Sequence, residues 1–416
     1  MYKILKFGGA SVKNAEGVRN LKKVLEIYKG EKLIVVISAM GKMTNQLEKV
    51  LDSWYYTPEI LKNNFEFVYN YHIDIAKQLE NKSGEITAVL MPIFDRLWKI
   101  LSCENSNHYD KDYDNIVSFG EYLSTKLIST YLNLNGYINE FSCAIDLVKT
   151  DDLYREGKVN WEETEKAIQS FVSKYPNKTI ITQGFLGGTL DGEVTTLGRE
   201  GSDFSAAIFA YCLNAKEVII WKDVPGLLNA DPKFYPNAIK LDEISYQEAI
   251  ELAYYGATII HPKTIKPLQN KHIPLFVKSF LSPYEEGTII ADVEHLEKIP
   301  CYIFKTEQIL LSIFPKDFSF IAADNLTKIF SYISKNKLKI NMMQNSAMSF
   351  TICIDNKPNR FVNMLKDLEE EFLVRYNMNT KLITIRHYTQ EAIDQVIGNQ
   401  PVILEQKSRH TLQVVL

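Results

Sequence analysis

Short apolar runs alternate with longer helical stretches through the first 290 residues. Several of these runs are continuously apolar, which is the pattern of strands buried on both faces of a parallel sheet. The alternation predicts a three-layer α/β/α sandwich, in which helices cover both sides of a mostly parallel sheet. The expected strands are 2–6, 32–38, 179–182, 217–221 and 275–278, and the expected helices between them are 44–55, 57–104 and 114–134.

The pattern changes near residue 290. The order strand, helix, strand, strand, helix, strand predicts an α+β, ferredoxin-like unit. A shorter group of one helix and two strands follows, and we expect it to be completed by a strand at 301–304. The elements of the first unit are expected at 309–314, 323–335, 339–343, 349–354, 360–372 and 382–386, and those of the second at 390–397, 402–405 and 412–416. The expected domains are therefore 1–290, 298–384 and 385–416.

Bulk composition excludes several classes of protein. A net charge of −4 argues against general nucleic-acid binding. The chain starts directly in a strand without a signal peptide, and no apolar run approaches the roughly 20 residues that span a membrane. The five cysteines lie far apart and the histidines form no ligand pair, so we expect reduced thiols, no bound structural metal and a cytoplasmic location.

A lysine and two glycines stand where the first expected strand meets a helix that begins near Asn14. Backbone N–H groups of Gly8 and Gly9 can approach an anion closely, and the helix N-terminus adds positive charge. Lys6 supplies a full charge for a terminal phosphate, and Ser11 lies at the helix entry. The stretch predicts a phosphate site, although a glycine-rich turn beside a solvated lysine fits these residues equally well.

Three further stretches carry polar residues in or next to expected helices. Arg199 precedes a helix and lies between Gly198 and Gly201, which favours an anion site. Asp203 can instead be a plain helix cap, and Thr44 is more simply interpreted as an N-cap. Glu121, on the helix containing Ser118-Phe-Gly-Glu-Tyr-Leu-Ser, is by default a surface glutamate.

Another loop, 221–233, leaves a buried strand through a Pro-Gly turn. Open α/β sheets bind ligands at the carboxyl ends of their strands, where this loop is expected to lie. His261, in the stretch 255–264, is more simply a packing residue than a catalyst.

Together and in this order, the stretches resemble the aspartokinases of the amino-acid kinase superfamily. The similarity covers residues 3 to 290, and the remainder resembles the paired ACT regulatory domains of that family. The stretches that carry it are KFGGASV, SAMGKMTN, SFGEYLS, TLGREGSD, WKDVPGLLNADP, SYQEAIELAYYGATIIHPKTI and IPLFVKSF. The resemblance implies ATP-dependent phosphorylation of the L-aspartate β-carboxylate, the first step of lysine, threonine and methionine biosynthesis. It further implies Mg²⁺ held through the nucleotide phosphates and assembly as a homodimer or larger homo-oligomer.

The resemblance also assigns roles to individual residues. The implied catalytic residues are Lys6, Arg199 and Asp203, and the implied aspartate-binding residues are Thr44, Glu121, Arg199 and Ser202. The implied ATP-binding residues are Lys6, Gly8, Gly9, Ser11, Lys222, Asp223, Leu228, Lys233 and Thr258. A lysine or threonine effector would be held by Ser319, Asn341, Gln344 and Asn345. The sequence ends without a dinucleotide-binding domain, which predicts a monofunctional enzyme.

The nucleotide segments depart from the family pattern. Thr258 stands where the family has lysine, Lys222 where threonine is usual, Leu228 where an aromatic is common, and Lys233 where arginine is usual. We expect Lys222 to restore the cation that is lost at position 258. Two alternatives stay open: an amino-acid sensor with a decayed kinase domain, and a glutamate, acetylglutamate or nucleoside-monophosphate kinase. For the ACT-like part, a dimerisation module with little effector binding is equally open.

Overall fold

The computed structural model describes residues 1–80, 84–257, 260–293, 298–317 and 319–416. Position 258, one of the predicted nucleotide contacts (Thr258), lies outside these residues. The chain divides into two compact units. The first comprises 1–227, 240–250 and 259–296, and the second comprises 228–239, 251–258 and 297–416. The second unit thus includes two segments from the middle of the sequence.

The first unit is built on a sheet that has eight strands among the described residues. Neighbouring strands from β11 through β3 run parallel, while β12 is antiparallel to β11. The strands, in sheet order, are β10 (Glu243–Ser245), β12 (Thr288–Ala291), β11 (Leu275–Ser279), β7 (Glu217–Lys222), β1 (Tyr2–Phe7), β2 (Lys32–Ile37), β4 (Thr179–Gln183) and β3 (Asn139–Ser142). The predicted parallel sheet is confirmed.

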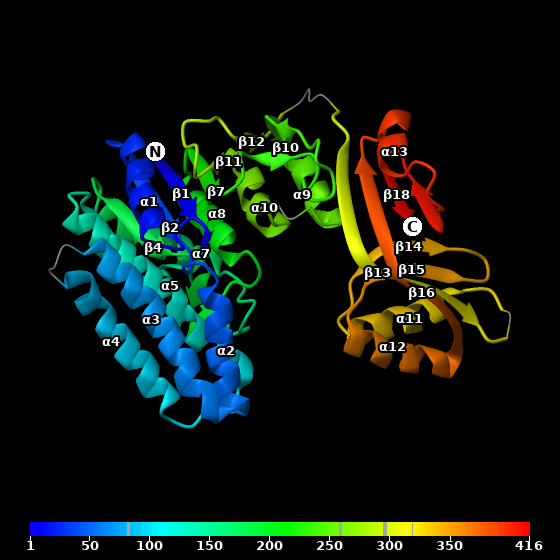
Figure 1. The fold of residues 1–416 in the computed structure, drawn as a ribbon, viewed down its shortest axis with the longest axis horizontal. Coiled ribbons are helices and arrows are strands. Elements are labelled where there is room, and N and C mark those ends of the chain that lie inside the picture. The colour runs from blue at the N-terminus through cyan, green and yellow to red at the C-terminus, as the bar shows by residue number, and fades with distance from the viewer. Residues whose placement is uncertain (81–83, 258–259, 294–297, 318) are drawn as a thin grey trace. The chain divides into compact units, whose positions relative to one another are not determined.

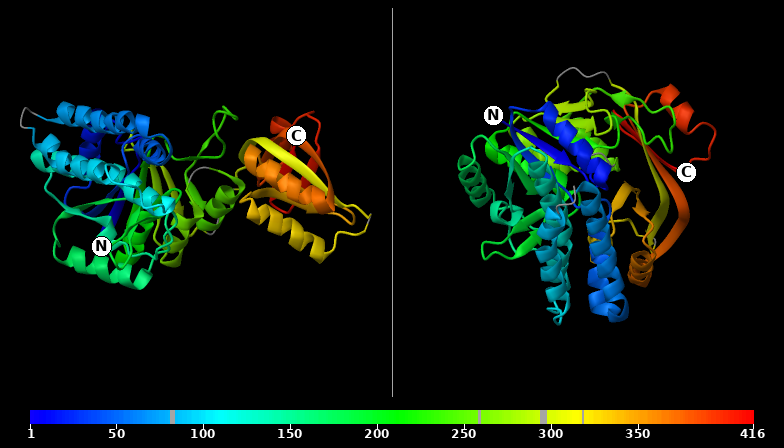
Figure 2. Two further views of the ribbon diagram at one scale, coloured as in Figure 1. Left: turned by 90° about the horizontal axis from the view of Figure 1, so that it is seen from below. Right: turned by 60° about the vertical axis from the view of Figure 1, so that its left-hand side comes forward.

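Helices cover both faces of this sheet (Figures 1 and 2). One layer is α1 (Ala15–Ile27), α2 (Met43–Tyr56), α3 (Leu61–Leu79), α4 (Glu85–Leu101) and α5 (Tyr109–Leu134), which share one apolar core with the sheet. The other elements of the unit include α6 (Ala144–Leu147), α7 (Trp161–Ser173), α8 (Gly201–Leu213), α10 (Pro262–Asn270) and the hairpin β5 (Leu186–Gly188) and β6 (Val194–Thr196). α8 packs directly on β1, β2 and β7. The predicted α/β/α sandwich is therefore confirmed.

Strand alternation decides which side chains reach α8. Leu5 and Phe7 of β1, like Trp221 of β7, belong to the core shared with α1–α5. Successive side chains of a strand point to opposite faces, so Lys6 and Lys222 face the α8 side. Two lysines of neighbouring strands therefore point toward one helix.

The second unit contains a six-stranded antiparallel sheet among its described residues, in the order β14-β15-β13-β16-β18-β17. Helices α11 and α12 share one apolar core with it, and α13 shares another. The elements are β13 (Cys301–Pro315), α11 (Ala323–Lys335), β14 (Ile340–Asn345), β15 (Phe350–Asp355), α12 (Pro358–Glu371), β16 (Phe372–Arg386), α13 (Gln390–Val396), β17 (Leu404–Lys407) and β18 (Thr411–Val415). The α+β character is as predicted.

Strand β16 is longer than the sequence predicted, because it begins at Phe372 rather than at 382. Its residues 382–386 pair with 301–305 of β13, and 372–380 pair with 308–315, with a register shift between Lys305 and Gln308. The expectation that 382–386 closes the first ferredoxin-like unit is therefore wrong, since 372–380 takes that place. Most side chains of 373–379 are exposed. Val374, Tyr376 and Met378 nevertheless alternate with polar residues there, so the segment had a strand signal that the prediction did not use. The predicted domain boundary between residues 384 and 385 stays a prediction, because β13 and β16 each run through both of the expected ferredoxin-like units.

Among the described residues, no helix combines the length and apolar character needed to cross a membrane. The short elements that remain are the 3-10 helix Pro58–Ile60, β8 (Leu227–Leu228), β9 (Lys240–Leu241) and α9 (Tyr246–Tyr255).

Candidate active site

A buried ion pair joins the end of β1 to the start of α8. Nζ of Lys6 lies 2.7 Å from Oδ1 of Asp203, and both side chains are almost completely buried. Asp203 is in the first turn of α8, whose N-cap is Glu200 and has no side-chain cap bond. Asp203 therefore pairs with a lysine rather than capping the helix, and the solvated-lysine alternative for Lys6 does not hold.

Lys222 reaches the same carboxylate from the neighbouring strand. Its Nζ lies 3.7 Å from Oδ2 of Asp203. Burial by itself would raise the pKa of Asp203, but attraction by Lys6 and then by Lys222 outweighs burial and holds the pKa below its ordinary value. Two ammonium groups around one carboxylate leave net positive charge, which suits a phosphate group.

The glycine loop after β1 is packed against the loop after β2. A side chain on Gly9 would place its Cβ 2.6 Å from the carbonyl oxygen of Ala39 and 2.7 Å from that of Gly41. The N–H of Gly41 donates to the Gly9 carbonyl at 2.9 Å, and the N–H of Ser11 donates to the Gly8 carbonyl at 3.0 Å. Glycine at position 9 is required by this close approach of two loops.

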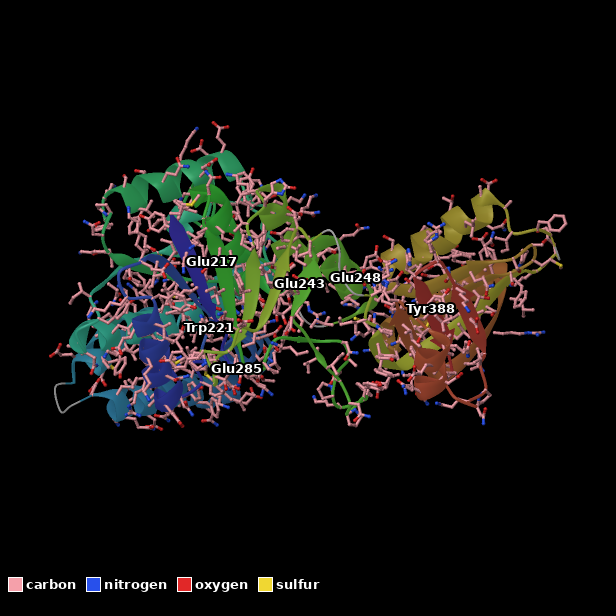
Figure 3. All side chains as sticks on the ribbon, turned by 90° about the horizontal axis from the view of Figure 1, so that it is seen from above. Glu217, Trp221, Glu243, Glu248, Glu285 and Tyr388 are labelled. Atoms are coloured by element: carbon pink, nitrogen blue, oxygen red, sulfur yellow. The ribbon has the colours of Figure 1, made fainter. Side chains whose placement is uncertain are left out.

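Ser11 links this loop to the end of β7. Its hydroxyl donates to the carbonyl of Trp221 at 3.4 Å, and Asn14 caps α1 by accepting from the N–H of Gly17. Figure 3 labels Trp221 and also Glu217, at the other end of β7. The loops of the predicted phosphate site thus meet at the carboxyl edge of the parallel sheet, where open α/β folds bind ligands.

Glu121 is buried on α5 rather than exposed, so the default interpretation of this residue was wrong. Its Oε1 accepts from the N–H of Ala39 at 3.2 Å, while Oε2 has no hydrogen-bond partner among the described residues. Burial, only partly offset by hydrogen bonds and by the charge of Lys6, raises the pKa of Glu121 to about 8. A buried carboxyl with one unused oxygen is well suited to bind a cation.

Thr44 comes close to this helix. A Cβ on Gly120 would lie 3.0 Å from Cβ of Ala39 and 3.9 Å from the backbone nitrogen of Thr44. α2 begins at Met43, and its N-cap is Lys42 without a side-chain cap bond. The N-cap interpretation of Thr44 is therefore wrong: the residue lies inside the first turn, next to the Glu121 segment.

Arg199 lies in the loop that enters α8. Its side chain is exposed and makes no hydrogen bond or ion pair within the described part of the chain. Gly198 and Glu200 on either side have positive φ values of 75° and 54°. Ser202 follows in α8, and a Cβ on Gly184 would lie 2.6 Å from the Ser202 Cβ. The loop is sharply bent, and Arg199 is at its tip.

Sequence reasoning did not single out two neighbours of this loop. Phe185 has a φ of 68°, unusual for a bulky residue, and its carbonyl accepts from the N–H of Leu197 at 2.8 Å. Nζ of Lys263 donates to the Leu197 carbonyl at 3.0 Å, and burial lowers the pKa of Lys263. The available signals were the Gly-Phe-Leu-Gly-Gly run and the lysine after His-Pro. His261 is the N-cap of α10, accepting from the Lys263 N–H.

The remaining predicted nucleotide residues are not tested by this geometry. Asp223 follows Lys222 and is exposed. Leu228 and Lys233 belong to the second compact unit, where the Lys233 N–H donates to Asp231. Their predicted contact with ATP stays a prediction.

In the second unit, the side chain of Asn341 is engaged in a polar network. Its Oδ1 accepts from Lys305 at 2.7 Å, and its Nδ2 donates to Gln308 at 2.7 Å and to Asp355 at 2.8 Å. The other predicted effector residues are exposed: Ser319, Gln344 and Asn345. Both Nδ2 hydrogens of Asn341 are thus already used, whereas its Oδ1 can still accept a second hydrogen bond.

Among the described residues, no group of three or more His, Cys, Asp or Glu side chains is arranged to hold a metal ion.

Comparison with known proteins decides the family. The sequence model of the amino acid kinase family matches residues 1–279. Aspartokinase 3, chloroplastic, of Arabidopsis thaliana is 30% identical over 411 residues, which cover 95% of this chain and 71% of that protein. The chain belongs to the aspartokinases.

A second relative of this aspartokinase is longer. The bifunctional aspartokinase/homoserine dehydrogenase of Buchnera aphidicola is 30% identical over 450 residues, covering 100% of this chain and 54% of its own length. The chain therefore spans about half of that protein.

Solved structures show the same fold. E. coli aspartokinase III in complex with lysine and aspartate has a TM-score of 0.85 at 22% identity, with 100% of this chain and 95% of that chain covered. Clostridium acetobutylicum aspartate kinase has a TM-score of 0.79 at 22% identity, with 99% and 96% covered. These likenesses extend the fold of the aspartokinases to both units of the sequence.

Proposed function

We propose that this aspartokinase transfers the γ-phosphoryl group of ATP to the β-carboxylate of L-aspartate, giving ADP and 4-phospho-L-aspartate. The observation that carries the proposal is the buried Lys6–Asp203 pair, at 2.7 Å, joined by Lys222 on the same carboxylate. The P–O bond to ADP breaks, and a new P–O bond to the aspartate carboxylate forms. A carboxylate is already a nucleophile at neutral pH, so the site needs alignment and charge neutralisation more than a base.

Two parts of the site suit the two ends of aspartate. Glu121 has a buried oxygen without a partner among the described residues, and an α-ammonium group would satisfy it. Arg199 projects from the bent loop before α8 and has the fork-shaped donors that bind a carboxylate in a bidentate manner. Thr44 and Ser202 supply hydroxyl groups beside these residues. An amino acid with a second carboxylate fits this donor set.

The phosphates are assigned to the glycine loop. Gly8 and Gly9 offer backbone N–H groups, Lys6 and Lys222 offer ammonium groups, and Ser11 lies at the rim. Both oxygens of Asp203 face a lysine, so this donor set fits Mg²⁺ carried by the nucleotide rather than held by the protein. Mg²⁺ supplies neutralisation of phosphate charge when bound. Contacts from Asp223, Leu228, Lys233 and Thr258 to the nucleotide are part of the proposal.

We also propose that lysine or threonine regulates the enzyme through the second unit. E. coli aspartokinase III has been solved with lysine and aspartate. In this chain the exposed candidates are Ser319, Gln344 and Asn345, since the Asn341 amide is already hydrogen-bonded. Assembly as a homodimer or larger homo-oligomer, acting in the cytoplasm, completes the proposal.

The test is acyl-phosphate formation from ATP and L-aspartate, trapped with hydroxylamine, with L-glutamate as the control substrate. The proposal expects turnover with aspartate, little with glutamate, and loss of turnover in Lys6→Met. Binding of aspartate without turnover would instead indicate an amino-acid sensor. Turnover with glutamate or a nucleoside monophosphate would assign the chain to another activity of the superfamily.

A further inference from the structure

A second buried carboxylate on α5 ties three segments together. Asp114 is fully buried. Its Oδ2 accepts from the backbone N–H groups of Arg155 and Thr196, both at 2.9 Å, and its Oδ1 accepts from the Thr196 hydroxyl at 2.7 Å. One carboxylate therefore fixes the 151–157 segment and the end of β6 to α5.

Both fixed segments lead to Arg199. Thr196 is the last residue of β6, three positions before Arg199. Gly198, between them, packs against the other segment, because a Cβ at this position would lie 3.2 Å from the Arg155 carbonyl oxygen. The arginine side chain itself has no partner among the described residues. Its position therefore depends on the backbone that Asp114 holds.

The same helix carries Glu121, seven residues further on. Seven residues are two helical turns, so the two carboxylates lie on one face of α5, about 10 Å apart along the axis. Glu121 contacts the loop after β2, whereas Asp114 contacts the approach to the Arg199 loop. One rigid element thus holds, directly or indirectly, both proposed ends of the aspartate site.

We propose that Asp114 is a positioning residue for aspartate binding, which sets the location of Arg199 relative to Glu121. The inference rests on the proposed function. Burial raises the pKa of Asp114 to about 6, and the hydrogen bonds from Arg155 and Thr196 oppose the rise, so the carboxylate is charged at neutral pH. Its hydrogen bonds are then charge-assisted and hold the loop firmly.

The experiment uses steady-state kinetics of the full chain with L-aspartate and ATP. Asp114→Ala removes all three hydrogen bonds and should raise the KM for aspartate about tenfold or more, with the KM for ATP within about twofold. Asp114→Asn should restore most of the affinity, because the amide oxygen can accept both N–H groups while its nitrogen donates to the Thr196 hydroxyl.

The matched control is Asp112→Ala, on the same helix. Asp112 is also buried, but the hydrogen bonds that it accepts from the Tyr55 hydroxyl at 2.6 Å and the Ser106 N–H at 2.9 Å involve neither of the two segments that Asp114 fixes. This variant should lose stability without changing the KM for aspartate. If both alanine variants change KM equally, or if Asp114→Ala leaves it unchanged, the positioning role is wrong.

If the Asp114→Ala variant does not fold, the Thr196→Val variant tests the positioning role instead. It removes only the hydroxyl bond and should raise the KM for aspartate about threefold, while an unchanged KM would overturn the inference. Failure of the proposed function is distinct, since the unmodified chain would then show no aspartate-dependent turnover.

Discussion

The ammonium group of Lys6 lies 2.7 Å from Oδ1 of Asp203, where β1 meets the first turn of α8. Both groups are buried, so removing either one would leave a buried charge without this partner. The pair fixes the direction of a lysine that would otherwise have several rotatable bonds. A pre-oriented cation is what phosphoryl transfer requires, because catalysis there is mainly positioning and charge neutralisation.

Replacing Asp203 by asparagine should disable this arrangement. Asp203→Asn removes the negative charge that Lys6 and Lys222 both approach, so we expect kcat to fall about 100-fold or more. The free energy of unfolding should fall by about 3–5 kcal/mol, the usual cost of breaking a buried pair. Kinetics and urea unfolding at neutral pH measure the two effects. A variant with normal kcat would show that the pair is only structural.

Lys222 offers a test of charge compensation. Lys222→Thr restores the residue usual in the family and should raise the KM for ATP or lower kcat by about tenfold, because one cation is lost from the phosphate site. Lys222→Arg should retain most of the activity. Lys216→Thr is the control, since Lys216 is exposed and precedes the opposite end of β7. Unchanged ATP kinetics in Lys222→Thr would contradict the compensation.

The raised pKa of Glu121, about 8, predicts a pH-dependent affinity for aspartate. Only the ionised carboxylate pairs with an ammonium group, so the proton must leave before aspartate binds. The KM for aspartate should therefore rise as pH falls below about 8, approaching about tenfold per pH unit. Glu121→Gln should bind aspartate about 10–100-fold more weakly and show no such slope. The measurement is KM for aspartate from about pH 6 to about pH 8.5, with the KM for ATP as internal control. A flat profile in the unmodified enzyme would remove Glu121 from the ammonium site.

The same residue should reduce the stability of the ligand-free protein in alkali. Because its folded-state pKa lies above the unfolded value, the folded state binds more protons between the two, and stability falls as pH rises through that window. Glu121→Gln should therefore be more stable than the unmodified protein at about pH 9, by a few kcal/mol, and similar at about pH 4. Urea unfolding at both values measures the difference. Equal stability at pH 9 would mean that the carboxyl is not held in an apolar setting.

Substitutions at Asn341 and Asn345 should have different effects: the first should reduce stability, and the second should weaken inhibition by the effector. Asn341→Ala removes the hydrogen bonds to Lys305, Gln308 and Asp355 and should cost about 1–3 kcal/mol in the free energy of unfolding. We expect its inhibition by lysine or threonine to be unchanged, whereas Asn345→Ala should weaken inhibition with little loss of stability. Thermal unfolding and inhibition curves compare the two variants. The opposite pattern would return the effector role to Asn341.

The apolar runs by themselves predicted five of the eight described strands of the parallel sheet, because strand burial depends on local residue type; β3, β10 and β12 were not predicted. The expected helical stretch 57–104 is instead divided into α3 and α4. The glycine motifs marked the loops of the proposed phosphate site, because tight turns also depend on local residue type. The sequence likewise marked the segments around Lys6 and Arg199 as candidate anion sites, because glycines lie near each charged residue. The full length of β16 was not predicted, although Val374, Tyr376 and Met378 alternate with polar residues in its first half.

Only the tertiary structure decided how the polar residues are used. From the sequence, Asp203 could be interpreted as a helix cap and Glu121 as a surface residue. Their burial beside Lys6 and Ala39 follows from strand register and helix packing, which bring together positions far apart in the chain. Asp114 carried no signal beyond its spacing from Glu121, because three hydrogen bonds to distant backbone and hydroxyl groups exist only once the sheet, α5 and β6 have assembled.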